Sequence, residues 1–285
     1  MRGASLARIG AEAAGRGGDE DPTVRYHFSA TNDETRHGKM IDKLFPDGVV
    51  ALEANPSMWE ESLEPEEERG LGSVVARRRR EYAAGRASAR AALARLGVRN
   101  CAIPRGPDRA PVWPAGIAGS IAHTADWCGA AVARVERFAG IGLDAETAVP
   151  LPEGVESILF TAREVVGLTQ LPAAPPGLSW MLVAFSAKEC TYKCIYPSTR
   201  AFLEFRDVEI SLDPATQSFA ARLLRGPTPA DGVRDVSGRF AFDGRRVYVG
   251  AVIHARPAGS PDDATATTAS RRAGAEPRSV SASAV

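Results

Sequence analysis

The sequence predicts an α+β fold of two similar subdomains, each a long helix packed on a small antiparallel sheet. Two stretches, about 71–96 and 179–195, carry apolar or small residues at helical spacing and are expected to form long helices. Short apolar runs bounded by turn residues precede, separate and follow these stretches, as expected for strands. No repeat in the sequence itself relates the two halves.

The composition is that of a globular protein with a sizeable core, 44% hydrophobic and 25% charged over 285 residues. Lys plus Arg (35) equals Asp plus Glu (35), so the net charge indicates no particular partner. The four cysteines form no C-x-x-C pair and suggest free thiols in a reducing compartment. No apolar run approaches the ~20 residues of a membrane helix, and the N-terminus has no signal-peptide core. We therefore expect a cytoplasmic protein that binds no membrane.

The two ends of the chain are expected to be disordered tails, because residues 1–38 and 256–285 lack any apolar periodicity. The folded body would then comprise an N-terminal subdomain, 39–143, and a C-terminal subdomain, 144–255.

In the first half, residues 48–54 are apolar and predict a strand. Residues 65–69 form an acidic turn or helix start, and the long helix 71–96 follows with Gly97 as its stop. Four prolines make 101–119 a loop or extended chain.

In the second half, Thr161 and Glu164 form a capping box that begins a short helix, 161–168. A Pro-rich linker, 172–177, leads to the second long helix, which we expect to end at Pro197. A hairpin turn is predicted at Asp243-Gly244. The apolar runs expected to form strands are 129–135 and 139–143, paired with each other, and then 205–212, 219–224, 239–242 and 247–254.

Asp144 and Glu146 follow an apolar strand and are separated by one residue, so both carboxylates point the same way. Two carboxylates on one edge repel unless a cation lies between them. Hard oxygen ligands favour Mg²⁺ or Mn²⁺ over zinc. Taken alone, such a pair is more often a solvated strand end.

The second long helix carries Glu189 and Lys193 at i and i+4, on one face, with Lys188 and Tyr192 as a parallel pair. An isolated pair of this kind would be a surface salt bridge worth only ~0.3–0.5 kcal/mol. A helix packed inward could instead present Glu189 as a third metal ligand.

Two further segments suggest phosphate binding. His123 follows the Gly-Ser-Ile-Ala sequence 119–122, which we expect to be a turn. An imidazole at this position could hold phosphate. A lone histidine is, however, more often structural. Arg78, Tyr82 and Arg86 recur every four residues on one helix face, and Arg90 continues the row. Such a row is either a solvated face or an anion site.

Taken together and in their order along the chain, these four segments resemble the Sfp/EntD-type 4′-phosphopantetheinyl transferases. The resemblance is closest to the branch serving siderophore and polyketide synthases. The resemblance covers about 76–197. It rests on R-R-x-E-[YF]-x-x-G-R-x-x-A-R-x-A-L, W-P-x-G-x-x-G-S-I-x-H, G-[IL]-D-x-E and F-S-x-K-E-x-x-Y-K. Leu143, Ala122 and Cys190 depart from the usual residues, but each lies beside a functional side chain and replaces none.

The resemblance implies the phosphopantetheinyl transferase fold and transfer of phosphopantetheine from coenzyme A to a carrier-protein serine, releasing 3′,5′-ADP. Asp144, Glu146 and Glu189 would hold Mg²⁺, or Mn²⁺, against the diphosphate. Glu189 would accept the serine proton, Lys193 would stabilise the leaving oxygen, and Lys188 would contact the diphosphate. Asp144 and Lys193 would thereby also adjoin coenzyme A.

The resemblance further implies that Arg78, Arg86 and His123 grip coenzyme A, chiefly its 3′-phosphate and diphosphate, and that Arg105 contacts its nucleotide. The expected partners are acyl and peptidyl carrier domains, and the expected state is a monomer in the cytoplasm. Which carrier is served stays open.

Three alternatives remain at this point. The run of arginines at 77–80 could bind nucleic acid, against which balanced charge and the lack of an aromatic RNA-binding motif argue. A non-catalytic protein that binds coenzyme A or docks carriers is the second, and a metal phosphohydrolase using the same carboxylates is the third.

Overall fold

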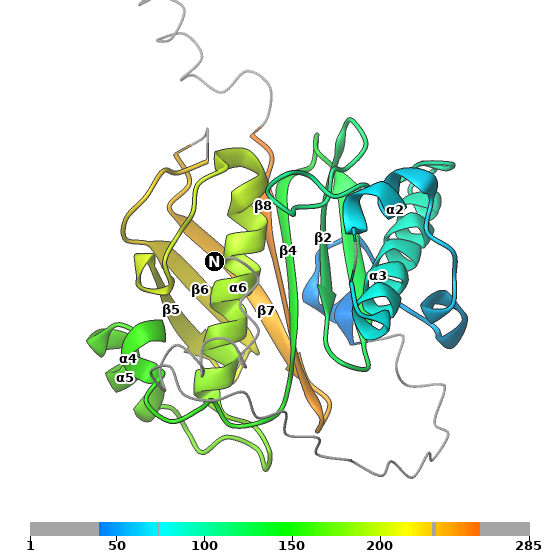
Figure 1. The fold of residues 1–285 in the computed structure, drawn as a ribbon. Helices are drawn as coiled ribbons and strands as arrows, with labels where there is room; N and C mark the ends of the chain where they lie inside the picture. The colour runs from blue at the N-terminus through cyan, green and yellow to red at the C-terminus, as the bar shows by residue number, and fades with distance from the viewer. Residues whose placement is uncertain (1–39, 73, 230–231, 257–285) are drawn as a thin grey trace, which may run out of the picture. The chain divides into compact units, whose positions relative to one another are not determined.

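Two antiparallel sheets, each covered by one long helix, make up the described part of the computed structural model, residues 40–72, 74–229 and 232–256 (Figure 1). The predicted α+β class is confirmed. The predicted tails lie outside these ranges, apart from Arg256. The described residues up to Ala255 belong to one compact unit.

The first sheet has the strand order β1-β3-β2 and is covered by α3 (Ala76–Arg95). Ala84, Ala89 and Ala92 of α3 are fully buried and let the helix lie close to the sheet, and Leu93 packs in the same core. The strands are β1 (Val50–Glu53), β2 (Ile117–His123) and β3 (Cys128–Arg134), and short helices η2 (Ile41–Leu44), η3 (Pro56–Trp59) and α2 (Pro65–Leu71) precede α3.

The second sheet has the order β4-β8-β7-β6-β5 and is covered by α6 (Trp180–Thr199). Phe185 lies at the centre of the core between them. The strands are β4 (Phe138–Thr147), β5 (Val208–Asp213), β6 (Ser218–Leu223), β7 (Asp235–Phe242) and β8 (Arg246–His254). The shorter helices are α4 (Glu156–Leu159), α5 (Ala162–Thr169) and η4 (Phe205–Asp207).

Two predictions that rest on local signals are confirmed. Thr161 and Glu164 form the capping box at the start of α5, with Thr161 N donating to the Glu164 carboxylate at 2.8 Å. β7 and β8 pair through the predicted hairpin, where Gly244 has φ +91° and the Asp243 side chain accepts from Arg245 N and Arg246 N.

The predicted pairing of 129–135 with 139–143 is wrong. β3 pairs with β1 and β2, whereas β4 pairs with β8, so the turn between β3 and β4 passes from one sheet to the other. The predicted boundary at 143/144 falls inside β4; the division into subdomains stays a prediction.

The residues 119–122 before His123 are strand, not turn. Gly119 lacks a positive φ, and the ring of Trp113 packs where its Cβ would stand, so this glycine serves close packing.

Two helix boundaries, at Gly72 and at Pro197, differ from expectation. The predicted helix 71–96 is two helices, because Gly72 ends α2 with φ +67° and α3 begins at Ala76. α6 continues past Pro197 to Thr199, since a proline in the last turn costs a single backbone hydrogen bond.

Strand β4 is the contact surface between the two sheets. On one edge it meets β2 without a ladder, and Ser120 Oγ accepts from Leu143 N at 3.0 Å in place of one. On one face it meets α6 through Gly140 and Gly142, where a Cβ would overlap backbone carbonyl oxygens of that helix. The helix backbone therefore lies directly on the strand.

Replacing Gly142 by alanine should force α6 away from β4, since the added Cβ would overlap the Cys190 carbonyl oxygen. We expect Gly142→Ala to lower the free energy of unfolding by about 1–3 kcal/mol, the usual cost of overpacking. Denaturant unfolding followed by circular dichroism measures this.

The matched control is Gly167→Ala in α5, where nothing lies within 4 Å of the added Cβ. This change should raise the free energy of unfolding by up to about 1 kcal/mol through helix propensity. Equal effects of the two alanines would contradict the close approach of α6 to β4.

Candidate active site

The face of β4 that carries Gly140 and Gly142 also carries Asp144 and Glu146, because alternate residues of a strand share a face. The two glycines bring α6 onto the strand, and the two carboxylates then follow along the same contact. From α6, Ser186, Glu189 and Lys193 lie at i, i+3 and i+7, on one helix face. Ser186 and Lys193 both contact Asp144 from this face.

Asp144 is 5% exposed and has a donor on each carboxylate oxygen. Lys193 Nζ donates to Oδ1 at 2.6 Å and also to Leu143 O at 3.2 Å. Ser186 Oγ donates to Oδ2 at 2.6 Å. Glu189 is 4% exposed, and its Oε1 finds no hydrogen-bond partner in the described part of the chain.

Asp144 and Glu189 are buried and Glu146 is half-buried, and the Lys193 charge offsets only part of the repulsion among these carboxyls. Burial, together with Asp144 and Glu189 and opposed by Lys193, raises the pKa of Glu146 to about 8. Burial and Asp144, again opposed by Lys193, raise the pKa of Glu189 to about 7. Burial alone would lower the pKa of Lys193, but Asp144 and Glu189 more than offset it and hold this pKa above its usual value. A divalent cation would stabilise the ionised carboxylates.

The donor set fits a hard cation in chemistry and charge, and Glu189 Oε1 is a buried oxygen that a cation would satisfy. The three carboxylates have not converged, however: no three His, Cys, Asp or Glu side chains among the residues described are gathered as metal ligands. One reason is that both carboxylate oxygens of Asp144 already accept hydrogen bonds, one from Ser186 and one from Lys193.

A second cluster, on α3 and β2, is positively charged. Arg78 Nη1 lies 2.6 Å from His123 Nε2 and donates to Glu81 Oε2 at 3.1 Å. Removal of water from around the ring, and after it the Arg78 charge, lower the pKa of His123 to about 4, although 36% of the side chain is exposed. The imidazole is therefore neutral near pH 7 and accepts from Arg78, and Glu81 helps to hold both groups.

Arg86 is 5% exposed, with its guanidinium 4.2 Å above the ring of Tyr82. Its Nε has no partner in the described ranges. Burial lowers the pKa of Arg86, partly opposed by Tyr82 and Glu67, and the Arg105 charge lowers it further. A buried, unsatisfied guanidinium beside another arginine is suited to an anion.

The two clusters adjoin one another. The pKa of Arg105 is lowered by burial and then by Arg109 and Arg78, so Arg105 lies near the Arg78 end of the positive cluster. His123 in turn senses the charges of Lys193 and Asp144 across the contact between β2 and β4. The structure thus brings together Arg78, Arg86, Arg105 and His123 on one side and Asp144, Glu146, Glu189 and Lys193 on the other.

Lys188 is not brought to the site, and its predicted contact with the diphosphate is corrected. Its side chain is 0% exposed, and Nζ donates to Glu164 Oε2 at 2.9 Å, Phe205 O at 2.7 Å and Val208 O at 2.5 Å. At roughly 100° per residue, Lys188 projects from the side of α6 opposite Ser186, toward α5 and β5. Its ion pair and hydrogen bonds link α6 to α5 and β5.

Two residues that contact the site had no predicted role. Ser186 lies inside the F-S-x-K-E segment, and its spacing of three from Glu189 was the available signal. Ser120 precedes His123 in the Gly-Ser-Ile segment and binds the backbone of Leu143, next to Asp144. Its partner is distant in sequence, so no local pattern indicated this contact.

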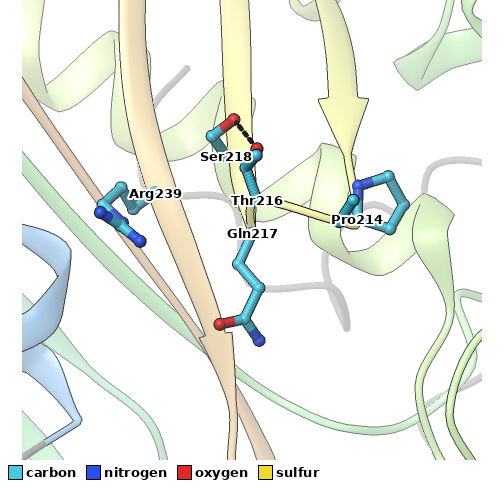
Figure 2. A pocket seen from close by; sticks show the side chains of 6 residues that line it. Pro214, Thr216, Gln217, Ser218 and Arg239 are labelled. Carbon is cyan, nitrogen blue, oxygen red and sulfur yellow. Dashed lines mark hydrogen bonds between the residues drawn. The ribbon is translucent and has the colours of Figure 1, made fainter.

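Figure 2 shows a shallow hollow at the turn between β5 and β6, where Thr216 and Ser218 share a hydrogen bond of 2.8 Å. None of the predicted site residues lines it, so it has no part in the site. Its lining comprises Pro214, Ala215, Thr216, Gln217, Ser218 and Arg239.

The fold and the site define a two-sheet α+β protein with an acidic and a basic cluster side by side. Residues 66–133 match the 4′-phosphopantetheinyl transferase N-terminal domain, and residues 140–244 match the 4′-phosphopantetheinyl transferase superfamily. The chain belongs to the 4′-phosphopantetheinyl transferase superfamily and is a transferase of this type. The resemblance inferred from the motifs is confirmed.

Two relatives span most of the chain, and a third spans less than half of it. The 4′-phosphopantetheinyl transferase Svp of Streptomyces mobaraensis is 37% identical over 84% of this chain and 98% of its own length. Npt of Nocardia iowensis, also a 4′-phosphopantetheinyl transferase, is 35% identical over 72% and 93%. Enterobactin synthase component D of Escherichia coli K12 is 35% identical over 46% and 61%.

None of the helices in the described ranges has the length and apolarity needed to cross a membrane.

Removing the Lys188 charge should destabilise the fold, because Glu164 would be left buried without its counter-ion. We expect Lys188→Met to lower the free energy of unfolding by about 3–5 kcal/mol, as when one partner of a buried pair is lost. Denaturant unfolding measures the change.

The control is Arg222→Met, which removes an exposed ion pair with Asp235. Exposed pairs contribute little, so its unfolding midpoint should stay near that of the wild type. A wild-type midpoint for Lys188→Met would refute the structural role of this lysine.

Proposed function

We propose that the protein transfers the 4′-phosphopantetheine group of coenzyme A to a serine of acyl or peptidyl carrier domains and releases 3′,5′-ADP. The observation that carries this proposal is that Asp144 and Glu189, both buried, and the half-buried Glu146 interact electrostatically with one another and with Lys193. Members of this family use coenzyme A and act on carrier domains, and this chain covers 98% of Svp and 93% of Npt, both of which are named 4′-phosphopantetheinyl transferases.

Asp144, Glu146 and Glu189 would hold Mg²⁺, with Mn²⁺ as the alternative, at the diphosphate of coenzyme A. When bound, the ion supplies positive charge that neutralises the diphosphate and stabilises its leaving oxygen. The raised pKa values of Glu146 and Glu189 support this assignment, because burial and, after it, the Asp144 charge disfavour the ionised carboxylates, which a bound cation would stabilise.

Glu189 is proposed to accept the proton of the carrier serine. Its Oε1 has no hydrogen-bond partner in the described residues, and its pKa, raised to about 7 by burial and Asp144, suits a base working near neutral pH. Lys193, one helical turn away, would stabilise the charge on the leaving phosphate. It already donates to Asp144, so the ammonium is held beside a carboxylate proposed to bind the ion, where it would be available to the developing charge.

The positive cluster would hold the phosphates of coenzyme A. Arg86 supports this best, since a buried guanidinium with a free Nε gains an anion as its partner. Arg78 and His123 form the neighbouring hydrogen-bonded pair, and Arg105 adds charge at the same end. His123 would act as an acceptor from Arg78 and orient it, because its lowered pKa leaves the ring neutral.

We further propose that the protein acts as a cytoplasmic monomer. The likeness to enterobactin synthase component D makes siderophore carriers one class of substrate to test, alongside polyketide, nonribosomal-peptide and fatty-acid carriers. The alternative of a protein that binds coenzyme A without catalysis is disfavoured by Glu189, a buried base with an unpaired oxygen. Nucleic-acid binding is disfavoured because Arg79 and Arg80 pair with Glu68 and Glu60.

Changing any one carboxylate should abolish transfer and leave the fold intact. We expect Asp144→Ala, Glu146→Ala and Glu189→Gln each to lose transfer, because the charge at the diphosphate is no longer neutralised. The assay is mass spectrometry of apo-carriers incubated with the protein, coenzyme A and Mg²⁺, with circular dichroism to check folding. Full conversion by any two variants would remove the carboxylates from the mechanism.

Arg86→Ala should raise the KM for coenzyme A more than it lowers kcat, because the guanidinium binds phosphate groups that do not react. The control is Arg80→Ala on the same helix, which removes an exposed arginine paired with Glu60. Its KM should match that of the wild type. An unchanged KM for Arg86→Ala, or equal shifts in the two variants, would exclude Arg86 from the binding site.

A further inference from the structure

Ser186 is completely buried on the face of α6 that packs against β4. Its hydroxyl donates to Asp144 Oδ2 at 2.6 Å, while Lys193 Nζ donates to Oδ1 at the same distance. A short hydrogen bond from a hydroxyl to a carboxylate is among the stronger kinds in proteins. Asp144 is therefore held on both oxygens by donors from a single helix.

Thr191 shows where a buried hydroxyl on this helix usually goes. It too is 0% exposed, and its Oγ1 donates to the carbonyl of Ala187, one turn back in its own helix, at 2.7 Å. Such bonds are the common fate of Ser and Thr inside helices. Ser186 differs because its hydroxyl crosses from the helix to the strand.

The hydrogen bond from Ser186 limits rotation of the Asp144 carboxylate. The terminal torsion of an aspartate is broad when nothing holds it. With a hydroxyl at one oxygen and an ammonium at the other, the plane of the Asp144 carboxylate is fixed relative to α6. The backbone before it is fixed as well, since Leu143 N donates to Ser120 Oγ at 3.0 Å.

We propose that Ser186 is a positioning residue for the transfer reaction: its hydroxyl orients the Asp144 carboxylate, and through it Lys193, toward the diphosphate of coenzyme A. This inference rests on the proposed function. Ser186 itself contacts neither substrate. Residues that orient ligands in this way typically contribute about 10-fold to 100-fold to activity or metal affinity.

The first test compares Ser186→Ala with Thr191→Val, which removes a buried hydroxyl from the same helix and leaves Asp144 untouched. The full chain is assayed with coenzyme A, Mg²⁺ and an apo-carrier. Ser186→Ala should lower kcat about tenfold or more, with the KM for coenzyme A changed less than about twofold, the pattern of an interaction made in the transition state. Thr191→Val should keep wild-type kcat. Equal kcat values for the two variants would overturn the inference.

The second test needs no activity. Unfolding free energies of Ser186→Ala, Asp144→Ala and the double variant form a cycle, and a parallel cycle replaces Ser186→Ala with Thr191→Val. Ser186 and Asp144 should be non-additive, and Thr191 and Asp144 additive. Additivity in the first cycle overturns the inference. Ser186→Cys, which keeps a donor at this position but a weaker one on a larger atom, replaces the alanine in both tests if the alanine variant does not fold.

The two proposals fail in different ways. A wild-type protein that transfers no phosphopantetheine refutes the proposed function, and the unfolding cycle then decides whether Ser186 holds Asp144. A wild-type protein that transfers normally while Ser186→Ala matches it refutes only the role of Ser186.

Discussion

The direct contact between the backbone of α6 and strand β4 is the constraint on which the site depends. Gly140 and Gly142 make it possible, because any side chain at either position would overlap carbonyl oxygens of the helix. At this separation, short side chains can bridge the two elements, as the 2.6 Å bond from Ser186 to Asp144 does. A strand with ordinary residues at 140 and 142 would hold the helix farther away, and a serine would no longer reach.

The contact between α6 and β4 also explains how Asp144 can be buried beside two other carboxyls. Burying carboxylates is costly unless they are paired or hydrogen-bonded. Asp144 is fully engaged by Ser186 and Lys193, while Glu146 and Glu189 are left with raised pKa values and one unsatisfied oxygen. The protein thus holds the Asp144 carboxylate in a fixed position, beside two carboxyls whose charged forms a cation would stabilise. Of the positive cluster, His123 on β2 interacts with Asp144 and Lys193 across the contact between β2 and β4, whereas the neighbours that shift the pKa of Arg86 are Tyr82, Glu67 and Arg105.

The sequence predicted those features whose signals are local. The capping box of Thr161 and Glu164, the hairpin at Asp243-Gly244 and the alternation of Asp144 with Glu146 each depend on residues within a few positions of one another. Strand pairing does not, and the assumption that neighbouring strands pair placed β3 beside β4. Glycine was also ambiguous: Gly72 does end a helix, but Gly119 lies in a strand under the ring of Trp113.

The two lysines of α6 show why a motif needs its helix face before roles can be assigned. Lys188 and Lys193 are five residues apart and both form an ion pair with a buried carboxylate. Five residues are about 500° of helix, so they project in clearly different directions. Lys193 meets Asp144 beside the other acids, whereas Lys188 meets Glu164, whose carboxylate also caps α5 and accepts from Ile210 N. Glu164 and Lys188 thus join α5, α6 and β5 at one point. That junction fixes the rotation of α6 about its own axis and so determines that Ser186, Glu189 and Lys193 face the strand.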